Sequence, residues 1–199
     1  MLVFWKENLV LLAVPKTGST ALQGALAPRA SIVFRDPPEM KHAPCYRYKR
    51  FLKPYCAQVG GQKPELMAIV RHPIDWLGSW YRYRTRDDLV GHDNSTREMS
   101  FDDFVLEYCK GQPATFANVG SQNKFLRIND GEIGAQHLFQ YEQWDKVIGY
   151  LENRLDMTIT LKHKNVSPAM DLRLSPATEA KLRDRRADEF TIWDLAHRA

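Results

Sequence analysis

The chain has 199 residues, enough for one domain with a buried core, and its 44% hydrophobic and 26% charged residues are typical of a soluble globular protein. A formal net charge of +4 suits an anionic ligand but is too small to indicate nucleic-acid binding. No stretch is apolar enough to predict a secretory signal or a membrane span, so we expect a single cytoplasmic domain over residues 1–199.

The first predicted element is a strand over residues 9–14, a short apolar run typical of a strand buried on both faces. Pro15 ends it, and helical periodicity begins at Ala21. At a turn from a strand into a helix, free backbone N–H groups and the positive end of the helix dipole point at one place. The turn also supplies a glycine, a lysine and three hydroxyls that suit a phosphate or sulfate: Lys16, Thr17, Gly18, Ser19 and Thr20.

Two other interpretations of this turn stay open. The phosphate loop of nucleotide triphosphatases needs Gly-x-x-x-x-Gly-Lys-[Ser/Thr]. Here Lys16 precedes the only glycine of the turn, Gly18, which counts against an ATP or GTP enzyme. An ordinary strand–helix connection that contains a lysine is the second alternative.

Residues 28–64 are expected to be irregular, because prolines and glycines interrupt any long element. Lys41 and His42 lie within them, and an aromatic and basic run follows over residues 45–55. That run is either a solvated basic face or the entry for a negatively charged donor or acceptor. Its cations are Arg47, Lys49, Arg50 and Lys53.

A second apolar run, residues 66–70, predicts another strand, and it ends at Arg71-His72-Pro73. Pro73 fits the first turn of the helix that follows. Arg71 then lies at the carboxyl end of a strand, where open α/β sheets bind ligands. Ser79 lies two turns into the helix, on a face that could turn back to the same ligand. A guanidinium and a hydroxyl together suit a terminal phosphate, although Arg71 alone could be a surface ion-pair partner.

The remaining elements are predicted from caps and periodicity. Three cysteines without metal-ligand spacing indicate reduced thiols and no metal site. The predicted elements are a helix capped by Ser100 and Asp103 and stopped at Gly111, a strand over 137–141 ended by Glu142, a helix over 144–155, a short strand over 158–161, a basic loop over 162–168 and a helix from Ser175-Pro176.

Residues 14–20 resemble the 5′-phosphosulfate loop of the sulfotransferase family, whose donor is 3′-phosphoadenosine 5′-phosphosulfate (PAPS). Arg71-x-Pro, followed by Ser79 and Tyr81, resembles the 3′-phosphate motif of that family. The order of elements from Gln122 to the helix after Glu142 resembles carbohydrate sulfotransferases. The resemblance implies an α/β, three-layer P-loop-like fold with a central parallel sheet flanked by helices.

The resemblance also implies site roles. Lys16 would be catalytic as well as binding: with the loop residues 17–20 it would hold the phosphosulfate and support the leaving phosphate. Arg71 and Ser79 would hold the 3′-phosphate, and no metal is required. His42 is the expected catalytic base, since uronyl 2-O sulfotransferases carry a catalytic histidine between the two motifs. His72 and His163 are weaker candidates, and Lys164 either encloses the nucleotide or is exposed. The acceptor would be a hydroxyl of a glycan or a small metabolite.

Two alternatives remain beside a PAPS-dependent sulfotransferase. A P-loop kinase would need ATP and Mg²⁺, and normally shows an acidic residue after an apolar strand, where this chain has Arg71. A protein that binds 3′-phosphoadenosine 5′-phosphate (PAP) without catalysis would keep the fold and lack turnover. The pattern carries no signal for an oligomeric state.

Overall fold

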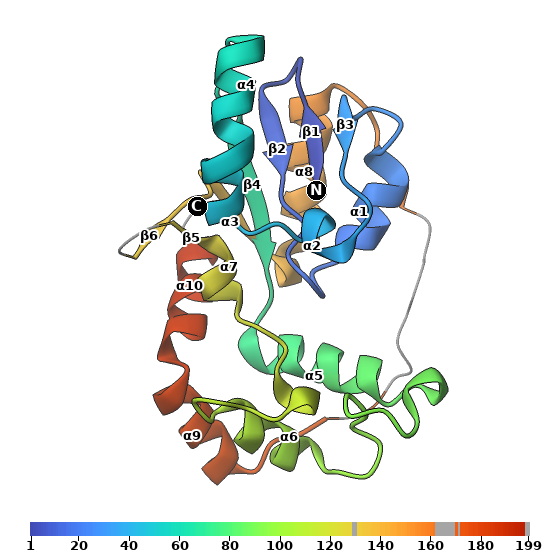
Figure 1. The fold of residues 1–199 in the computed structure, drawn as a ribbon, viewed down its shortest axis with the longest axis vertical. Coiled ribbons are helices and arrows are strands. Elements are labelled where there is room, and N and C mark those ends of the chain that lie inside the picture. Colours follow the sequence, from blue (N-terminus) through green and yellow to red (C-terminus); the bar gives the residue numbers. More distant parts are fainter. Residues whose placement is uncertain (129–130, 162–169, 171, 198–199) are drawn as a thin grey trace.

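A computed structural model describes residues 1–128, 131–161, 170 and 172–197. Figure 1 shows a twisted sheet with helices packed against it, and a second group of helices beyond one end of its strands. The strands are β1 (Leu2–Phe4), β2 (Leu9–Leu11), β3 (Ile32–Val33), β4 (Glu65–Val70), β5 (Arg127–Ile128), β6 (Glu132–Ile133) and β7 (His137–Gln140). The α-helices are α1 (Ser19–Leu26), α2 (Pro38–Lys41), α3 (Cys45–Arg47), α4 (Lys53–Gly60), α5 (Pro73–Arg84), α6 (Phe101–Tyr108), α7 (Gln122–Leu126), α8 (Trp144–Leu155), α9 (Pro176–Arg185) and α10 (Ala187–His197). Short turns of other helix types are η1 (Tyr48–Leu52), η2 (Asp87–Leu89), η3 (Thr115–Ala117) and η4 (Tyr141–Gln143).

Within the described residues, the main sheet has the order β3-β1-β2-β4-β7. β2, β4 and β7 are parallel, whereas β1 pairs antiparallel with both β2 and β3. The chain is therefore α/β, as expected, but its sheet is mixed and the expectation of a wholly parallel sheet is wrong. Only four residues, 5–8, connect β1 to β2. A connection that short can form a hairpin and is too short for the crossover that parallel strands need.

Helices cover both faces of this sheet, because successive residues of a strand point to opposite faces. On one face, side chains of β1, β2 and β4 such as Leu11 and Met67 pack against α1 and α8. On the other face, alternate residues such as Val10 and Ala68 pack against α3, α7 and α10. A separate apolar cluster joins α5, α6 and α9.

The prediction of an irregular segment over residues 28–64 is wrong for much of its length. β3 and α2 lie within it, and α3, η1 and α4 run continuously from Cys45 to Gly60. Pro44 precedes α3, whereas Pro54 lies inside the continuous helical segment, after the π-helical turn. The π-helical turn η1 lies immediately before Pro54 and widens the helix there.

Cap chemistry predicted the later helices correctly. Ser100 and Asp103 form a reciprocal capping box at α6, and the Ser175 hydroxyl accepts from the N–H of Thr178 at the start of α9. β7 and α8 are also confirmed. The strand expected over residues 158–161 is absent, since the structure assigns no strand there. No helix in the described part of the chain is long and apolar enough to cross a bilayer.

Candidate anion-binding site

The turn between β2 and α1 has a left-handed backbone at two positions, Lys16 with φ 66° and Gly18 with φ 74°. The Thr17 hydroxyl donates to the carbonyl of Val14 at 2.9 Å and is buried, so it closes the turn and its proton is not available to a ligand. Gly18 is the N-cap of α1, and its carbonyl accepts hydrogen bonds from the N–H groups of Ala21 and Leu22. The N–H groups of Ser19 and Thr20, the first two residues of the helix, have no acceptor within it and can donate to a ligand.

Lys16 extends from this turn to α5. Its Nζ lies 4.3 Å from the ring centroid of Tyr83 and 5.4 Å from that of Trp80. Burial lowers the pKa of Lys16 to about 8, and the positive charges of Arg86, Arg71 and Arg82 add to this effect. The lysine of the first motif and the arginine of the second are therefore electrostatic neighbours.

Arg71 follows β4 directly and lies beside Tyr141, with 4.5 Å between its guanidinium carbon and the ring centroid. Its Nε is buried and has no hydrogen-bond partner, and the same holds for the indole Nε1 of Trp80. A buried donor without an acceptor destabilises the folded protein. Unpaired donors beside an excess of positive charge are therefore typical of an anion-binding site.

Lys16, Arg71, Arg82 and Arg86 form what we call the four-cation cluster. None of the four makes an ion pair with a residue that the structure describes. Asp75 is one acid whose charge acts on the cluster, through Arg82, but it lies beyond ion-pair distance. The cluster therefore has an uncompensated positive charge that a polyanion would neutralise.

Ser79 is 8% exposed on α5. Arg82 and Tyr83 lie three and four residues after it, so the three share one face of the helix. On that face, the ring of Tyr83 contacts the ammonium of Lys16, and the charge of Arg71 lowers the pKa of Arg82. Ser79 thus lies on the face of α5 that also carries Arg82 and Tyr83.

His42 lies on another side of the α1 turn, directly after α2. Its Nδ1 is 2.6 Å from the carbonyl oxygen of Ala13, near the end of β2. Burial lowers the pKa of His42, with smaller contributions from neighbouring positive charges. A carbonyl oxygen can only accept, so Nδ1 carries the proton and Nε2 of the neutral ring is the free base.

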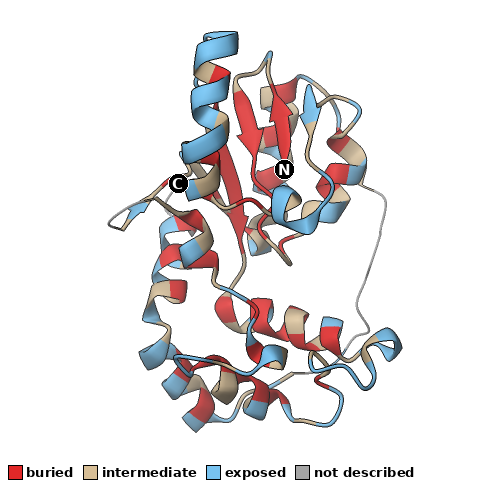
Figure 2. Cartoon of the chain, viewed as in Figure 1, coloured by how far each residue is buried: buried red, intermediate tan, exposed pale blue. Residues whose placement is uncertain are grey.

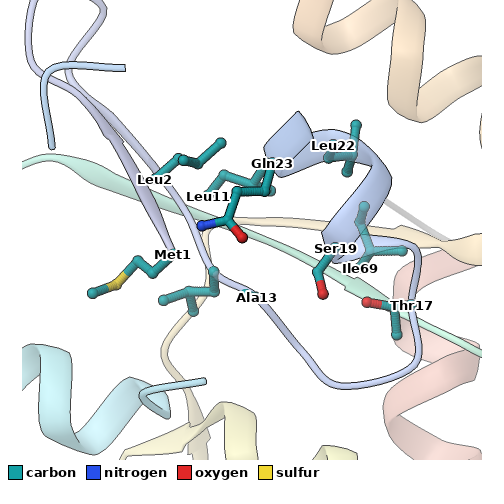
Figure 3. Close-up of a pocket in the computed structure, with 10 residues that line it drawn as sticks. Met1, Leu2, Leu11, Ala13, Thr17, Ser19, Leu22, Gln23 and Ile69 are labelled. Atoms are coloured by element: carbon teal, nitrogen blue, oxygen red, sulfur yellow. The ribbon is translucent and has the colours of Figure 1, made fainter. Parts of the chain in front are cut away.

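His42 lines an open pocket of about 920 Å³ between α1 and the segment that leads into α2. Thr20 lines the same pocket, and Lys41 Nζ lies 3.4 Å from its hydroxyl. A much smaller cavity of about 10 Å³ lies behind the turn, with apolar walls from Leu11, Leu22 and Ile69 (Figure 3). It has room for a single water molecule at most, so of these two cavities the pocket beside His42 is the one large enough for an organic ligand.

Two further candidates have structural contacts. The ring of His72 packs edge-on against Trp193, with centroids 4.9 Å apart, and against Phe190 at 5.8 Å. Glu142 uses both of its carboxylate oxygens, one for the backbone N–H of His72 at 2.8 Å and one for Trp193 Nε1 at 2.9 Å. Glu142 thus links the end of β4 to α10.

The basic run of residues 45–55 is not part of this site. Its cations line neither the pocket beside His42 nor the four-cation cluster, so the expectation that they flank a ligand entry finds no support in the geometry. His163 and Lys164 lie outside the described residues. Within those residues, no group of three or more His, Cys, Asp or Glu side chains could hold a metal ion.

Sequence reasoning missed several residues of the site. Arg82 and Tyr83, near the end of α5, and Arg86, just after it, lie around the Lys16 ammonium. Helical spacing places Arg82 and Tyr83 on the same face as Ser79, but it carries no signal that this face packs against the Lys16 turn. No family model matches the chain, and neither a curated protein nor a solved structure is similar enough to it to count as a relative.

Proposed function

We propose that this protein is a PAPS-dependent sulfotransferase that moves a sulfuryl group to a hydroxyl of a sugar or small-molecule acceptor. The observation that carries the proposal is the proximity of Lys16 and Arg71, which come from two separate motifs and whose charges repel each other. PAPS has an anionic group at each end, a 3′-phosphate and a 5′-phosphosulfate. One such ligand would meet both motifs at once.

In the proposed complex, the ammonium of Lys16 and the open amides of Ser19 and Thr20 bind the 5′-phosphosulfate. Gly18, which has no side chain, lets the turn pack directly against the ring of Trp144. Arg71 and Ser79 bind the 3′-phosphate, and the unpaired Nε of Arg71 gains its missing partner. Fixed cations and dipoles of this kind stabilise the charge that builds up on the leaving phosphate, which is the main task in sulfuryl transfer as in phosphoryl transfer.

His42 serves as the base. Its lowered pKa keeps the ring neutral at pH 7, and the Ala13 carbonyl holds the tautomer in which Nε2 accepts a proton. The acceptor hydroxyl, bound in the pocket shared by His42 and Thr20, attacks sulfur in line with the leaving oxygen. The bond from sulfur to the 5′-phosphate oxygen breaks, PAP departs, and the hydroxyl proton passes to Nε2.

The P-loop-like character of the fold belongs to the same proposal. A strand, a tight turn and a helix follow one another from β2 to α1, and β2 and β4 are adjacent and parallel. The two motifs therefore lie after the carboxyl ends of neighbouring strands, which is where ligands bind in open α/β sheets. This arrangement supports a phosphate-loop core that carries an additional antiparallel strand, β1.

Calorimetry with PAP, ATP and GTP, each with and without Mg²⁺, tests the proposal. We expect PAP to bind most tightly and without a need for Mg²⁺, and we expect Lys16→Ala and Arg71→Ala to weaken binding at least tenfold. Arg97→Ala removes an exposed arginine that pairs with Asp87, and it serves as the control that should leave PAP affinity unchanged.

A screen of hydroxyl acceptors with labelled PAPS then tests turnover. Binding of ATP that exceeds that of PAP and needs Mg²⁺ would contradict the proposal and favour a kinase. Tight PAP binding without transfer to any acceptor in the screen would instead favour a non-catalytic PAP-binding protein.

A further inference from the structure

The helical segment from Cys45 to Gly60 leaves large apolar side chains in contact with solvent. Phe51 is 63% exposed, Tyr55 60% and Val59 71%. These residues are spaced four apart, so they fall along one side of the segment. In Figure 2 the outer side of α4 is coloured as exposed over most of its length, and Figure 1 shows the helix extending along the outside of the sheet.

The stretch of residues 40–64, which includes this helical segment, has only basic charged residues. Residues 40–64 contain six Lys and Arg residues and neither Asp nor Glu. The whole chain has 28 basic and 24 acidic residues, so the remaining residues carry 22 basic against 24 acidic ones. The positive net charge of the protein therefore comes from this one segment. Its cations are Lys41, Arg47, Lys49, Arg50, Lys53 and Lys63.

Cations and rings lie side by side on this surface. The guanidinium of Arg50 is 5.3 Å from the ring centroid of Phe51, and Arg47 donates to the Tyr46 hydroxyl at 3.0 Å. No ion pair to a described residue neutralises any cation of residues 47–53. Phe51, Tyr55 and Val59 form an apolar stripe, and Arg50 and Lys53 lie on the adjoining side of the helix. We call these five exposed residues, two from η1 and three from α4, the outer face of α4.

The outer face of α4 rests on a rigid base. Tyr48 is 2% exposed and Cys56 4%, and both point into the protein. Gly60 lies so close to Trp5 that an added Cβ would fall 1.9 Å from the indole. The helix is thus held firmly against the protein while its apolar residues face outward. An exposed ring-rich surface has a solvation cost, which is a feature of surfaces that meet a partner.

We propose that the outer face of α4 binds the surface of a bilayer that contains anionic lipids. Aromatic rings on one side of a helix, flanked by Lys and Arg, suit the headgroup region, where the rings insert and the cations meet lipid phosphates. Peptide partners usually need a groove or a free strand edge, and the outer face of α4 is the convex flank of a helix. A bilayer is broad enough to cover such a flank and supplies the negative charge that the segment lacks.

Sedimentation of the full-length protein with lipid vesicles tests this proposal, which does not depend on the proposed sulfotransferase activity. The probes are vesicles of phosphatidylcholine alone and vesicles of phosphatidylcholine mixed with phosphatidylglycerol. We expect binding to the mixed vesicles and little binding to the neutral ones. The double variants Phe51→Ser/Tyr55→Ser and Arg50→Glu/Lys53→Glu should each bind at least about tenfold more weakly.

Matched controls change exposed residues elsewhere. Val90→Ser removes an exposed apolar side chain and Lys181→Glu reverses an exposed charge, and neither should alter vesicle binding. Thermal unfolding checks that each variant is folded. Should a double variant fail to fold, the single variant Lys53→Glu, at an exposed position, gives the same comparison.

Three results would overturn the proposal. Wild-type protein that fails to sediment with the mixed vesicles would do so, as would variants of the outer face that bind like wild type. Retention on immobilised heparin without vesicle binding would also overturn it, and would assign this face to an acidic polymer.

Discussion

Gln122 hydrogen-bonds to the backbone of Arg71 through both ends of its side-chain amide. Its Oε1 accepts from the Arg71 N–H at 2.8 Å, and its Nε2 donates to the Arg71 carbonyl at 2.9 Å. Gln122 itself is fully buried at the start of α7, and its backbone N–H donates to the buried carboxylate of Glu189 at 3.1 Å. The C-terminal helix α10 thus fixes the backbone of Arg71 through Gln122, and with it the base of the arginine side chain.

Gln122→Ala should therefore affect both stability and ligand binding. Two backbone groups of Arg71 lose their partners, so we expect the free energy of unfolding to fall by about 2 kcal/mol. PAP affinity should fall as well, because the arginine that would hold the 3′-phosphate is no longer fixed. Urea unfolding measures the first effect, and calorimetry at a temperature where the variant is folded measures the second.

Gln136 provides a matched control at the opposite end of β4. Its Oε1 accepts from the N–H of Leu66 at 2.7 Å, so Gln136→Ala also removes a hydrogen bond to the strand backbone. This variant should lose stability and keep its PAP affinity. Equal PAP binding by Gln122→Ala and wild type would refute the positioning role of Gln122.

Two glycines of the α1 region should respond in opposite ways to alanine. Gly18 has φ 74°, and an added Cβ would lie 2.6 Å from the ring of Trp144. Gly18→Ala should destabilise the protein by roughly 2 kcal/mol and weaken PAP binding, since the turn must shift. Gly24 lies within α1 and has no atom within 4 Å of an added Cβ. Gly24→Ala should stabilise the protein by up to about 1 kcal/mol.

Thermal or urea unfolding of the two variants side by side measures this difference. A Gly18→Ala variant as stable as Gly24→Ala would show that the turn tolerates a different backbone geometry. The left-handed conformation would then be no requirement of the site.

Periodicity predicted the elements whose buried residues form a regular pattern in their own sequence. The apolar runs at β2, β4 and β7 and the stripe of α8 were found, because alternate or helical spacing is visible without a partner. β1 was missed, since its apolar run stops at Lys6 and is shorter than the run over residues 9–14 that predicted β2. The helix from Cys45 was missed because the prolines were counted, whereas their positions decide the outcome: Pro44 precedes the helix, and Pro54 follows the π-helical turn η1 inside it.

The site shows a similar division. Lys16 and Arg71 could be predicted to meet, because the carboxyl ends of adjacent parallel strands share one edge of a sheet. Arg86 and Tyr83 could not, since their approach to Lys16 depends on how α5 lies against the turn. The side-chain contact between Gln122 and Arg71 joins α7 to β4, and no local pattern in the sequence encodes it.

Lys16 should take up a proton when an anion binds. Its pKa of about 8 means that about half of the free protein has a neutral lysine at pH 8. A bound polyanion favours the ammonium and raises the pKa, so PAP binding at pH 8 should consume up to about half a proton. Calorimetry in buffers with different ionisation enthalpies measures this number. Lys16→Arg keeps the charge at all accessible pH values and should abolish the uptake; the same uptake in that variant would exclude Lys16 as its source.

The same shift predicts how the stability of the free protein depends on pH. The folded pKa of Lys16 lies below its ordinary value of 10.5, so the unfolded chain binds more protons between about pH 8 and 10.5. Lys16 therefore adds stability as the pH rises through this window and destabilises the fold below it. At pH 7, Lys16→Met should be more stable than wild type by on the order of 1 kcal/mol, and the difference should shrink towards pH 10. Urea unfolding across this range checks the sign, and a difference that does not change with pH would contradict it.

His42 should be a neutral imidazole with its proton on Nδ1. The 2.6 Å contact with the Ala13 carbonyl requires that tautomer, and burial lowers the pKa below the ordinary value of 6.5. Nitrogen-15 NMR of the ring distinguishes the two tautomers and follows the titration. A protonated Nε2 at pH 7 would remove His42 as the base.

Once an acceptor is identified, His42→Ala should reduce turnover by about two to four orders of magnitude while PAP affinity stays near that of wild type. Because the base must be neutral, wild-type turnover should fall only below pH 6.5, and this acidic limb should be absent from the residual activity of His42→Ala.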